Sequence, residues 1–543
     1  MLRKTALVVV FVFLVSLAAC GGEAAAPAAT LVQVTPLPTD TAAPPTDPPP
    51  TAETTAELQA NRLWRDATDE TIGETARWTN KVELADINGD GWIDLLFANG
   101  GSYDSPGAPL LSYVFLNRGP DQPYEDASEK TLGTEGMLAR VIKVRDVNGD
   151  DLPDIMVGTT FQTQSRLFLG EGDGVFREVT ATHLPQQVAS VGDLEFGDVD
   201  ADGDLDMVLA DWGPGSPMAN IGGWTMLWLN DGSGRFTDAT EERMPTNRVR
   251  FSWELEFADV DNDYDLDILV SCKICAGSYL FENDGAGTFS NVSSERLPLG
   301  TNNYDFEAMD LNGDMYLDLV TVNDGSKMRE RLFLNDRQGG FEKHSMELWP
   351  NEDNPPDTDD NMIVFFDFES DGDADFLIGA LNSLDRVLLN DGHANLRLLS
   401  DKPLFTVRTR ATLGIAVADL NGDDRMDIVE AQGEVSDAPW DEKVYFGQDI
   451  SPDTAPPIIS LVSASGDPLT VRARIHDNKS PTMPHDWQSV VVRWTGADGQ
   501  AHETPLQWYG EYLWRATLEE SPTADVTYQV CAVDAAGNEA CSP

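Results

Sequence analysis

An acidic nine-residue segment that recurs seven times constrains the fold of this chain more than any other feature. Two of its copies are DINGDGWID at 86–94 and DLNGDDRMD at 419–427, and Asp stands at positions one, five and nine of every copy. The first Asp residues of successive copies are 51 to 61 residues apart. A sequence period of this size is typical of propellers and solenoids, in which each repeat is one supersecondary unit.

Short β-strand patterns surround each acidic segment. An apolar run such as LDMVLADWG follows the segment, then a second run such as MLWLNDGSGRF, and most repeats end in a strand such as FTDATEERMP. With the strand before the segment, this makes about four strands per repeat, which predicts an all-β chain with a seven-bladed β-propeller over 58–450. The seventh repeat lacks its last strand, and LWRDATDETIG at 63–73 matches it. We therefore expect the N-terminal strand to close the ring.

The repeat resembles the FG-GAP/VCBS family, whose propeller form resembles the head of integrin α subunits. The resemblance rests on the D-x-[DN]-x-D-G-x-x-D pattern, the apolar strand after it and the LNDGxGxF motif, and it covers about residues 60–450. It implies a propeller fold and cation binding. It says little about biological role, because the repeat occurs in adhesins, lectin-like proteins and extracellular enzymes alike.

The spacing of the acidic residues predicts calcium binding. Ca²⁺ takes six to eight oxygen ligands, and side chains at positions one, three and five, a backbone carbonyl at seven and a carboxylate at nine can supply them. Position three is an oxygen donor in all seven copies, and the odd positions together hold 27 of the 93 acidic residues. Up to seven structural Ca²⁺ ions are expected. The predicted ligands are Asp86, Asn88, Asp90 and Asp94; Asp146, Asn148, Asp150 and Asp154; Asp198, Asp200, Asp202 and Asp206; Asp259, Asp261, Asp263 and Asp267; Asp310, Asn312, Asp314 and Asp318; Asp367, Glu369, Asp371 and Asp375; and Asp419, Asn421, Asp423 and Asp427.

Two copies depart from the pattern. The fourth has no Gly at position four or six, where Asn262 and Tyr264 stand, so its turn is expected to be the least favourable. In the sixth, Glu369 is one methylene longer than the Asp or Asn found elsewhere at position three.

The strand before each acidic segment should be innermost and line the central channel. The residues three positions before the first Asp are Glu83, Lys143, Glu195, Glu256, Glu307, Val364 and Ala416. Glu195, Glu256 and Glu307, together with Trp253, form a tentative ligand site, because aromatic rings beside carboxylates suit carbohydrate binding. A solvated channel wall is the alternative. No catalytic motif is present, so no catalytic residue is assigned.

The N-terminus has the layout of an export signal. Residues 1–19 begin with Arg3 and Lys4 and continue as an apolar run that is too short to span a bilayer, which predicts a signal peptide. The LAAC sequence that ends at Cys20 resembles the lipobox of bacterial lipoproteins, which implies lipidation of Cys20. The Pro-, Thr- and Ala-rich segment 20–57 is expected to be a disordered tether. We therefore expect an extracytoplasmic lipoprotein at the cell surface or on the periplasmic face.

Four other cysteines form two close pairs, Cys272 with Cys275 and Cys531 with Cys541. In an exported protein such pairs are disulfide candidates. The last pair belongs to segment 453–543, which has alternating strands and resembles the immunoglobulin-like or fibronectin-III-like modules of bacterial surface proteins. A small β-sandwich is expected there.

The net charge limits the partners. With 36 basic and 93 acidic residues the formal charge is −57, which excludes unaided binding to nucleic acid or to an anionic membrane, so the membrane contact is through the lipid anchor alone. The chain is predicted to be a binding or adhesion module for a glycan or protein ligand. The alternative is a calcium-dependent lyase or hydrolase acting on carbohydrate at the acidic channel mouth.

Overall fold

The computed structural model describes residues 63–120, 122–300, 303–323, 328–343, 347–356, 358–381, 384–399, 411–433, 441–496, 499–518 and 526–542. The predicted signal peptide, Cys20 and the whole of the tether region lie outside these residues. In the part of the chain that is described, no helix is long and apolar enough to cross a membrane.

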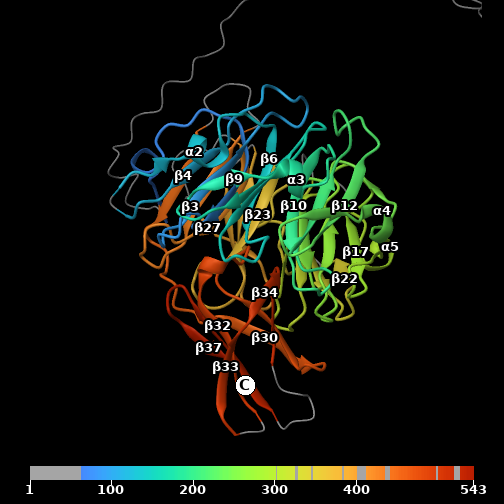
Figure 1. Ribbon diagram of the computed structural model, residues 1–543, viewed down its shortest axis with the longest axis vertical. Helices are drawn as coiled ribbons and strands as arrows, with labels where there is room; N and C mark the ends of the chain where they lie inside the picture. The colour runs from blue at the N-terminus through green and yellow to red at the C-terminus, as the bar shows by residue number, and fades with distance from the viewer. Residues whose placement is uncertain are drawn as a thin grey trace, which may run out of the picture. The chain divides into compact units, whose positions relative to one another are not determined.

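Seven antiparallel sheets occupy the described residues between 64 and 447, as Figure 1 shows. Each of the first six begins with four strands consecutive in the sequence, and a fifth strand, β14 (Arg248–Val249), is added to the third sheet. The first three sheets contain β2 (Thr79–Ala85), β3 (Asp94–Asn99), β4 (Tyr113–Leu116) and β5 (Glu125–Asp126); β6 (Ala139–Arg145), β7 (Asp154–Thr159), β8 (Arg166–Gly170) and β9 (Phe176–Glu178); and β10 (Val191–Gly197), β11 (Asp206–Asp211), β12 (Gly223–Asn230) and β13 (Phe236–Asp238). The next three contain β15 (Leu255–Ala258), β16 (Asp267–Val270), β17 (Tyr279–Asn283) and β18 (Phe289–Asn291); β19 (Asn303–Met309), β20 (Asp318–Asn323), β21 (Arg331–Asn335) and β22 (Phe341–Lys343); and β23 (Asp360–Phe366), β24 (Asp375–Ala380), β25 (Arg386–Leu389) and β26 (Arg397–Leu398).

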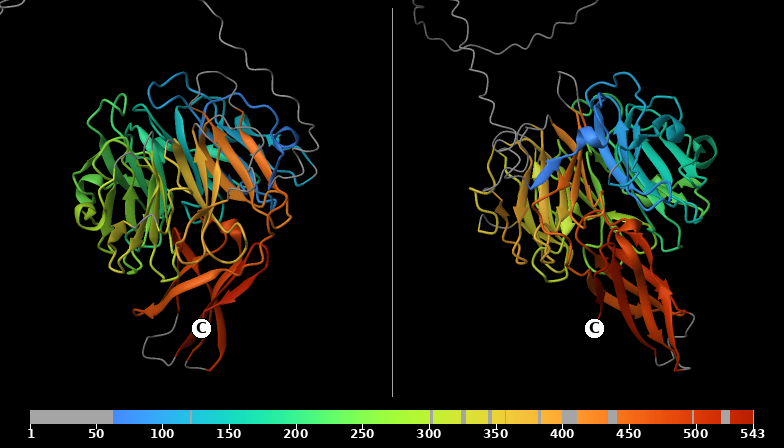
Figure 2. Two further views of the ribbon diagram at one scale, coloured as in Figure 1. Left: turned by 180° about the vertical axis from the view of Figure 1, so that it is seen from behind. Right: turned by 90° about the vertical axis from the view of Figure 1, so that its left-hand side faces the viewer.

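The seventh sheet joins the two ends of this region. Its order is β1-β29-β28-β27, from β27 (Thr412–Ala418), β28 (Asp427–Gln432) and β29 (Lys443–Gly447) to β1 (Trp64–Asp66). Trp64 pairs with Gly447 and Asp66 with Tyr445, so the prediction that the N-terminal strand completes the last repeat is confirmed. In Figure 2 this blue strand lies beside the orange strands of the last sheet. The first strand of each sheet contacts the first strand of the next, and β27 contacts β2, an arrangement consistent with a propeller.

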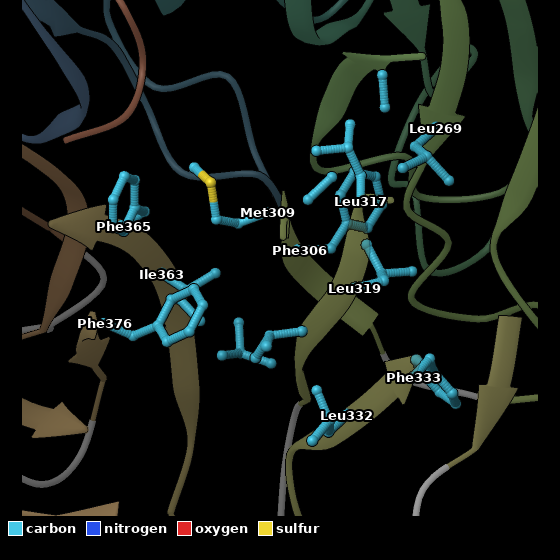
Figure 3. Packing of buried hydrophobic residues seen from close by; sticks show 14 of the residues in the cluster. Leu269, Phe306, Met309, Leu317, Leu319, Leu332, Phe333, Ile363, Phe365 and Phe376 are labelled. Atoms are coloured by element: carbon cyan, nitrogen blue, oxygen red, sulfur yellow. The ribbon is translucent and has the colours of Figure 1, made fainter. Parts of the chain in front are cut away.

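Apolar side chains fill the spaces between neighbouring sheets. The inner strands β2, β19, β23 and β27 are buried along their whole length, which is expected when both faces of a strand are covered. Figure 3 shows one such layer, in which Phe306 and Leu319 of the fifth sheet share a cluster with Ile363, Phe365 and Phe376 of the sixth. Sheet-to-sheet packing of this kind fixes the positions of the loops that connect the inner strands to the second strands.

Short helical segments complete the repeats. They are η1 (Thr68–Glu70), α2 (Ser128–Leu132), α3 (Thr180–His183), α4 (Thr240–Arg243) and α5 (Ser293–Arg296). Except for α2, none exceeds four residues, and each follows the outermost strand of its sheet.

The C-terminal domain, residues 453–542, holds two further four-stranded sheets, β30-β31-β35-β34 and β33-β32-β36-β37. Their strands are β30 (Ile458–Ser465), β31 (Thr470–His476), β32 (Trp487–Thr495), β33 (Ala501–Pro505), β34 (Gln507–Gly510), β35 (Leu513–Thr517), β36 (Thr527–Asp534) and β37 (Glu539–Cys541), with η2 (Pro484–Asp486) between β31 and β32. Val471, Val492, Trp514 and Val530 bring both sheets into one hydrophobic cluster.

Backbone hydrogen bonds join the C-terminal domain to loops of the repeat region. The Asp198 N–H donates to the Tyr509 carbonyl at 2.8 Å, and the Ser480 N–H donates to the Phe365 carbonyl at 3.1 Å. The Asp367 N–H donates to the Asn478 carbonyl at 2.7 Å. Since Asp198 and Asp367 each begin an acidic segment, the domain contacts the side of the repeats on which those segments lie.

Candidate metal loops and a carboxylate cavity

Each acidic segment forms the loop between the first and second strand of its sheet. We call these segments metal loops one to seven: 86–94, 146–154, 198–206, 259–267, 310–318, 367–375 and 419–427. The Asp at position nine begins the second strand and is buried in all seven loops. In loop one, Asp94 Oδ2 accepts the Ile87 N–H at 3.0 Å and Asp94 Oδ1 accepts the Asn117 N–H at 2.8 Å. The last ligand of each loop is therefore held by the sheet itself.

The backbone of the loop wraps around the carboxylate of the Asp at position one, which accepts hydrogen bonds from backbone N–H groups of the same loop. In loop one, Asp86 Oδ1 accepts the Gly89 N–H at 2.7 Å and Asp86 Oδ2 accepts the Gly91 N–H at 2.8 Å. Loops two, five and seven repeat both bonds from positions four and six. Because the backbone donors fix the carboxylate, the loop has a defined shape before any ion binds.

Positions four and six have positive φ in all seven loops. Asn262 and Tyr264 of loop four adopt this conformation, with φ of 65° and 72°, so the absence of Gly does not change the backbone of that loop. Tyr264 is held there from the C-terminal domain, since its hydroxyl donates to the Leu461 carbonyl and its carbonyl accepts the Tyr509 hydroxyl at 3.0 Å. These contacts offset the cost of a left-handed Tyr. In loop six, Glu369 is exposed.

Four buried oxygens in these loops have no hydrogen-bond donor. They are Oδ1 of Asn148, Asp200 and Asp261, all at position three, and Oδ1 of Asp373 at position seven of loop six. In loops three and four, carboxylate oxygens of three residues also lie within 4.8 Å of one another: Asp198, Asp200 and Asp206, and Asp259, Asp261 and Asp263. A buried acceptor without a donor is costly, and a hard cation satisfies it. The residues present therefore fit Ca²⁺.

Burial raises the pKa of the position-nine carboxyls, against the backbone donors that lower it. The pKa is raised to about 8 for Asp94, about 7 for Asp154, about 8 for Asp206, about 8 for Asp318 and about 9 for Asp375. A metal ion binds the ionised carboxylate, so ion binding to these loops would release protons and would weaken as the pH falls.

A second group of carboxylates lines a cavity of about 120 Å³ enclosed by the inner strands. All seven residues expected to face the channel, from Glu83 to Ala416, line it. Glu511 of the C-terminal domain lines it too, as do Lys479 and Met483. We call it the carboxylate cavity.

The structure brings together three of the four residues of the predicted ligand site. Glu195, Glu256 and Glu307 line the carboxylate cavity, but Trp253 is not among its lining residues. Trp253 is fully buried and packs against Phe251 and Tyr304, with the Arg140 guanidinium 3.8 Å from its ring centre. Trp253 precedes β15, which begins at Leu255, and its side chain belongs to a hydrophobic cluster rather than to the cavity lining.

Lysine and arginine neutralise part of the cavity. Lys81 Nζ lies 2.5 Å from Glu254 Oε1 and 3.0 Å from Asp193 Oδ1. Lys143 pairs with Glu195, and Arg145 Nη1 lies 2.7 Å from Glu83 Oε1. The sequence pattern identified the acids but not these pairs, because each joins strands of different repeats.

The remaining acids are held close together. Burial, and then repulsion from Glu307 and Glu511, raises the pKa of Glu256, whose Oε2 is buried without a hydrogen-bond partner. Burial also raises the pKa of Glu511 to about 8 and the pKa of Glu307. The Tyr512 hydroxyl donates to Glu307 Oε1 at 3.2 Å. The C-terminal domain therefore contributes Glu511 and Tyr512 to this group of acids, most of which come from the inner strands.

Both predicted cysteine pairs are disulfides, Cys272–Cys275 and Cys531–Cys541. The second joins β36 to β37. Sequence reasoning missed a further acidic cluster, Asp453, Asp477 and Asp534, whose carboxylate oxygens lie within 4.8 Å of one another. No spacing signal could have found it, because its members come from three separate segments.

The chain was compared with solved structures, curated proteins and family models, and the family model supports the repeat assignment. A structure of BBS1N in complex with ARL6DN, soaked with mercury, is similar at 9% identity and a TM-score of 0.43, covering 72% of this chain and 98% of that chain. The V. cholerae biofilm matrix protein Bap1 is similar at 13% identity and a TM-score of 0.34, covering 88% of this chain and 75% of that chain. No curated protein matches the sequence. The FG-GAP-like repeat model matches residues 86–157, 146–209, 218–270, 310–378 and 367–430. These segments make up more than half of the chain, which therefore belongs to the FG-GAP-like repeat family.

Proposed function

We propose that this chain is a calcium-binding module in which up to seven Ca²⁺ ions stabilise the metal loops. The observation that carries the proposal is the set of four buried loop oxygens without a donor, on Asn148, Asp200, Asp261 and Asp373. Each is an oxygen ligand of the kind that Ca²⁺ prefers, and a buried acceptor left unpaired costs about 1–3 kcal/mol.

A direct ion count tests this proposal. The full chain is stripped of metal, dialysed against 1 mM CaCl₂ and analysed by mass spectrometry for calcium per chain; several ions, up to seven, are expected. Asp150→Asn, at position five of loop two, should remove one ion. Asp173→Asn makes the same chemical change at an exposed Asp outside the loops and should remove none. Less than one ion per chain in the unaltered protein would refute the proposal.

The architecture we infer around these loops is a seven-bladed propeller followed by a β-sandwich. The propeller is supported by the seven sheets, by the contacts from β27 back to β2 and by cavity-lining residues from every inner strand. Two sheets sharing one hydrophobic cluster support the sandwich. An experimental structure of the full chain would test both.

We propose a binding or adhesion role for the module rather than an enzymatic one. The carboxylate cavity holds about 120 Å³, whereas pockets for small molecules usually hold roughly 300–1,000 Å³. A partner would therefore bind outside it. With a formal charge of −57, the chain favours a neutral glycan or a basic protein.

A glycan array and a protein pull-down with the calcium-loaded chain, each repeated in EDTA, would identify that partner. Turnover of a polysaccharide that is lost in Glu256→Gln would favour the alternative, a lyase or hydrolase. Calcium-dependent binding without turnover would favour the adhesion module.

The anchoring we propose places the chain outside the cytoplasm, attached through lipid on Cys20. Labelling with a radioactive fatty acid should mark the chain, and Cys20→Ser should abolish both the label and partition into detergent. Cys272→Ser is the control, since it removes a different cysteine. Equal labelling of the Cys20→Ser variant would contradict the anchor.

A further inference from the structure

Two arginines of the C-terminal domain bind metal loops three and four. Arg474, only 2% exposed, donates from Nη2 to the Asp259 carbonyl at 2.8 Å, to Asp259 Oδ2 at 3.1 Å and to Asn262 Oδ1 at 2.8 Å. Arg515 pairs with Asp198 Oδ2. Asp259 and Asp198 both stand at position one of their loops. The C-terminal domain thus places a guanidinium on the equivalent carboxylate of two successive loops.

The two oxygens of each carboxylate have different surroundings. Asp198 Oδ1 accepts the Asp202 N–H at 3.1 Å, and Asp259 Oδ1 accepts the Asp263 N–H at 3.0 Å, so both Oδ1 atoms face their own loop. The arginines bind Oδ2. In Asp198 this oxygen also accepts the Gly203 N–H of its own loop at 2.9 Å. A guanidinium on Oδ2 and an ion on Oδ1 would share the negative charge of one carboxylate.

The same two loops carry a second arginine each. Arg243 of α4 lies 3.3 Å from Asp200 Oδ2, and Arg296 of α5 lies 3.1 Å from Asp261 Oδ2. Loops three and four each have acids at all five odd positions, and two arginines lower that local charge to −3. Loop six also has five acids, but among the described residues it forms no ion pair with a basic side chain. It is a natural reference for an uncompensated loop.

We propose that calcium binding in loops three and four is antagonistic to docking of the C-terminal domain, through Arg515 and Arg474. The inference rests on the calcium binding proposed above and adds its regulation. Two positive groups on one carboxylate repel each other, so each weakens the binding of the other. Coupling of this kind is reciprocal, and removal of one arginine should tighten calcium binding to its loop by roughly threefold to tenfold.

Antagonism between calcium binding and docking of the C-terminal domain would also affect the carboxylate cavity. Glu511, which lines the cavity, and Tyr512, which donates to Glu307, form the turn between β34, which contains Tyr509, and β35, which contains Arg515. A calcium-loaded chain would hold this part of the C-terminal domain less firmly. Calcium would thus control how tightly the domain closes the cavity.

Hydrogen–deuterium exchange of the full chain across a series of free calcium concentrations tests the coupling loop by loop. In Arg474→Gln the calcium concentration that protects 259–267 should fall by roughly threefold to tenfold, and in Arg515→Gln the same should hold for 198–206. Loop six should not change in either variant. Arg493→Gln, which breaks an exposed pair with Glu503 in the same domain, is the matched control. In the unaltered chain, the Ser480 N–H should exchange faster as calcium rises.

The outcomes separate the two proposals. If no loop gains protection at any calcium concentration, calcium binding itself is wrong. If the loops are protected but the midpoints of loops three and four stay the same or rise in the arginine variants, the antagonism is wrong. Arg515→Gln tests the coupling independently if Arg474→Gln does not fold, because Arg515 is the more exposed of the two.

Discussion

The metal loops and the carboxylate cavity are both rich in acidic side chains, but the negative charge of those side chains is compensated differently in the two regions. In the loops, acids that are neighbours in sequence curl around a common point, and buried oxygens such as Asp261 Oδ1 are left without a donor. In the cavity, acids from different repeats meet lysines and an arginine, as Lys81 meets Glu254 and Asp193. Loops three and four pair with two arginines each but keep more acids than cations, whereas the cavity acids meet Lys81, Lys143 and Arg145 of neighbouring strands.

Clustered negative charge should therefore affect the stability of the two regions in different ways. A loop without its ion keeps uncompensated carboxylates, so its stability should depend on calcium. The cavity contains internal ion pairs, and burial raises the pKa of Glu256 and of Glu511, so its stability should depend on mutation and pH instead. Each contrast can be measured.

Removal of calcium should have the largest effect. At 1 mM Ca²⁺ and a Kd of about 0.1 mM, each site contributes about 1.4 kcal/mol, so several sites together contribute on the order of the stability of a whole domain. Thermal melting in EDTA against 1 mM CaCl₂ should show Tm lowered in EDTA by about 5–10 °C. MgCl₂ at the same concentration is the control for ionic strength and valence. An unchanged Tm would contradict the expectation that the stability of the loops, unlike that of the cavity, depends on calcium.

Loss of a cavity cation should be the next largest effect. Lys81→Met leaves Glu254 and Asp193 without their shared ammonium group, and breaking a buried pair in this way costs about 3–5 kcal/mol. Urea unfolding should show the same loss with calcium and with EDTA, because the cavity does not take its cation from solvent. Lys130→Met, at an exposed lysine of α2, should change stability little. A loss seen only with calcium would contradict the comparison.

Local spacing explains which parts the sequence could predict. The seven loops, the strands beside them and the closing strand Trp64–Asp66 depend on residues a few positions apart, and all were found. The parity of inner-strand positions also placed Glu195, Glu256 and Glu307 in one cavity. Trp253 was grouped with them because aromatic rings beside carboxylates suit carbohydrate binding, but its side chain packs in a hydrophobic cluster that the sequence did not reveal.

Long-range pairing explains what could not be predicted. Lys81 meets Glu254 across 173 residues, and Arg474 meets Asp259 across 215. No period or motif marks either partner, because a salt bridge between distant segments requires only one basic and one acidic side chain. Tyr264 shows the same limit, since its unfavourable turn is supported by Leu461 and Tyr509 of another domain.

The pH dependence of stability should expose the proton uptake in the cavity. The pKa of Glu511 is raised to about 8 by burial, so the folded chain binds more protons than the unfolded chain. The stabilisation is fully present below the unfolded pKa and is lost as the pH rises through about 8. In EDTA, unfolding free energy should therefore fall between pH 5 and pH 8.5. Glu511→Gln should make the decrease in unfolding free energy between these pH values smaller by about 1–3 kcal/mol. Glu503→Gln, at an exposed site, should leave that decrease unchanged.

The smallest effect, and the sharpest test of the loops, should come from Asn148→Ala. Asn148 Oδ1 is buried without a hydrogen-bond donor, so its loss should cost little in EDTA and about 1 kcal/mol in calcium. Asn312 at the same position of loop five differs, because its amide nitrogen donates to Asp318 Oδ2 at 3.0 Å. Asn312→Ala should therefore also destabilise the chain in EDTA, by about 1 kcal/mol. Equal losses for both variants in EDTA would mean that the oxygen of Asn148 is satisfied without an ion.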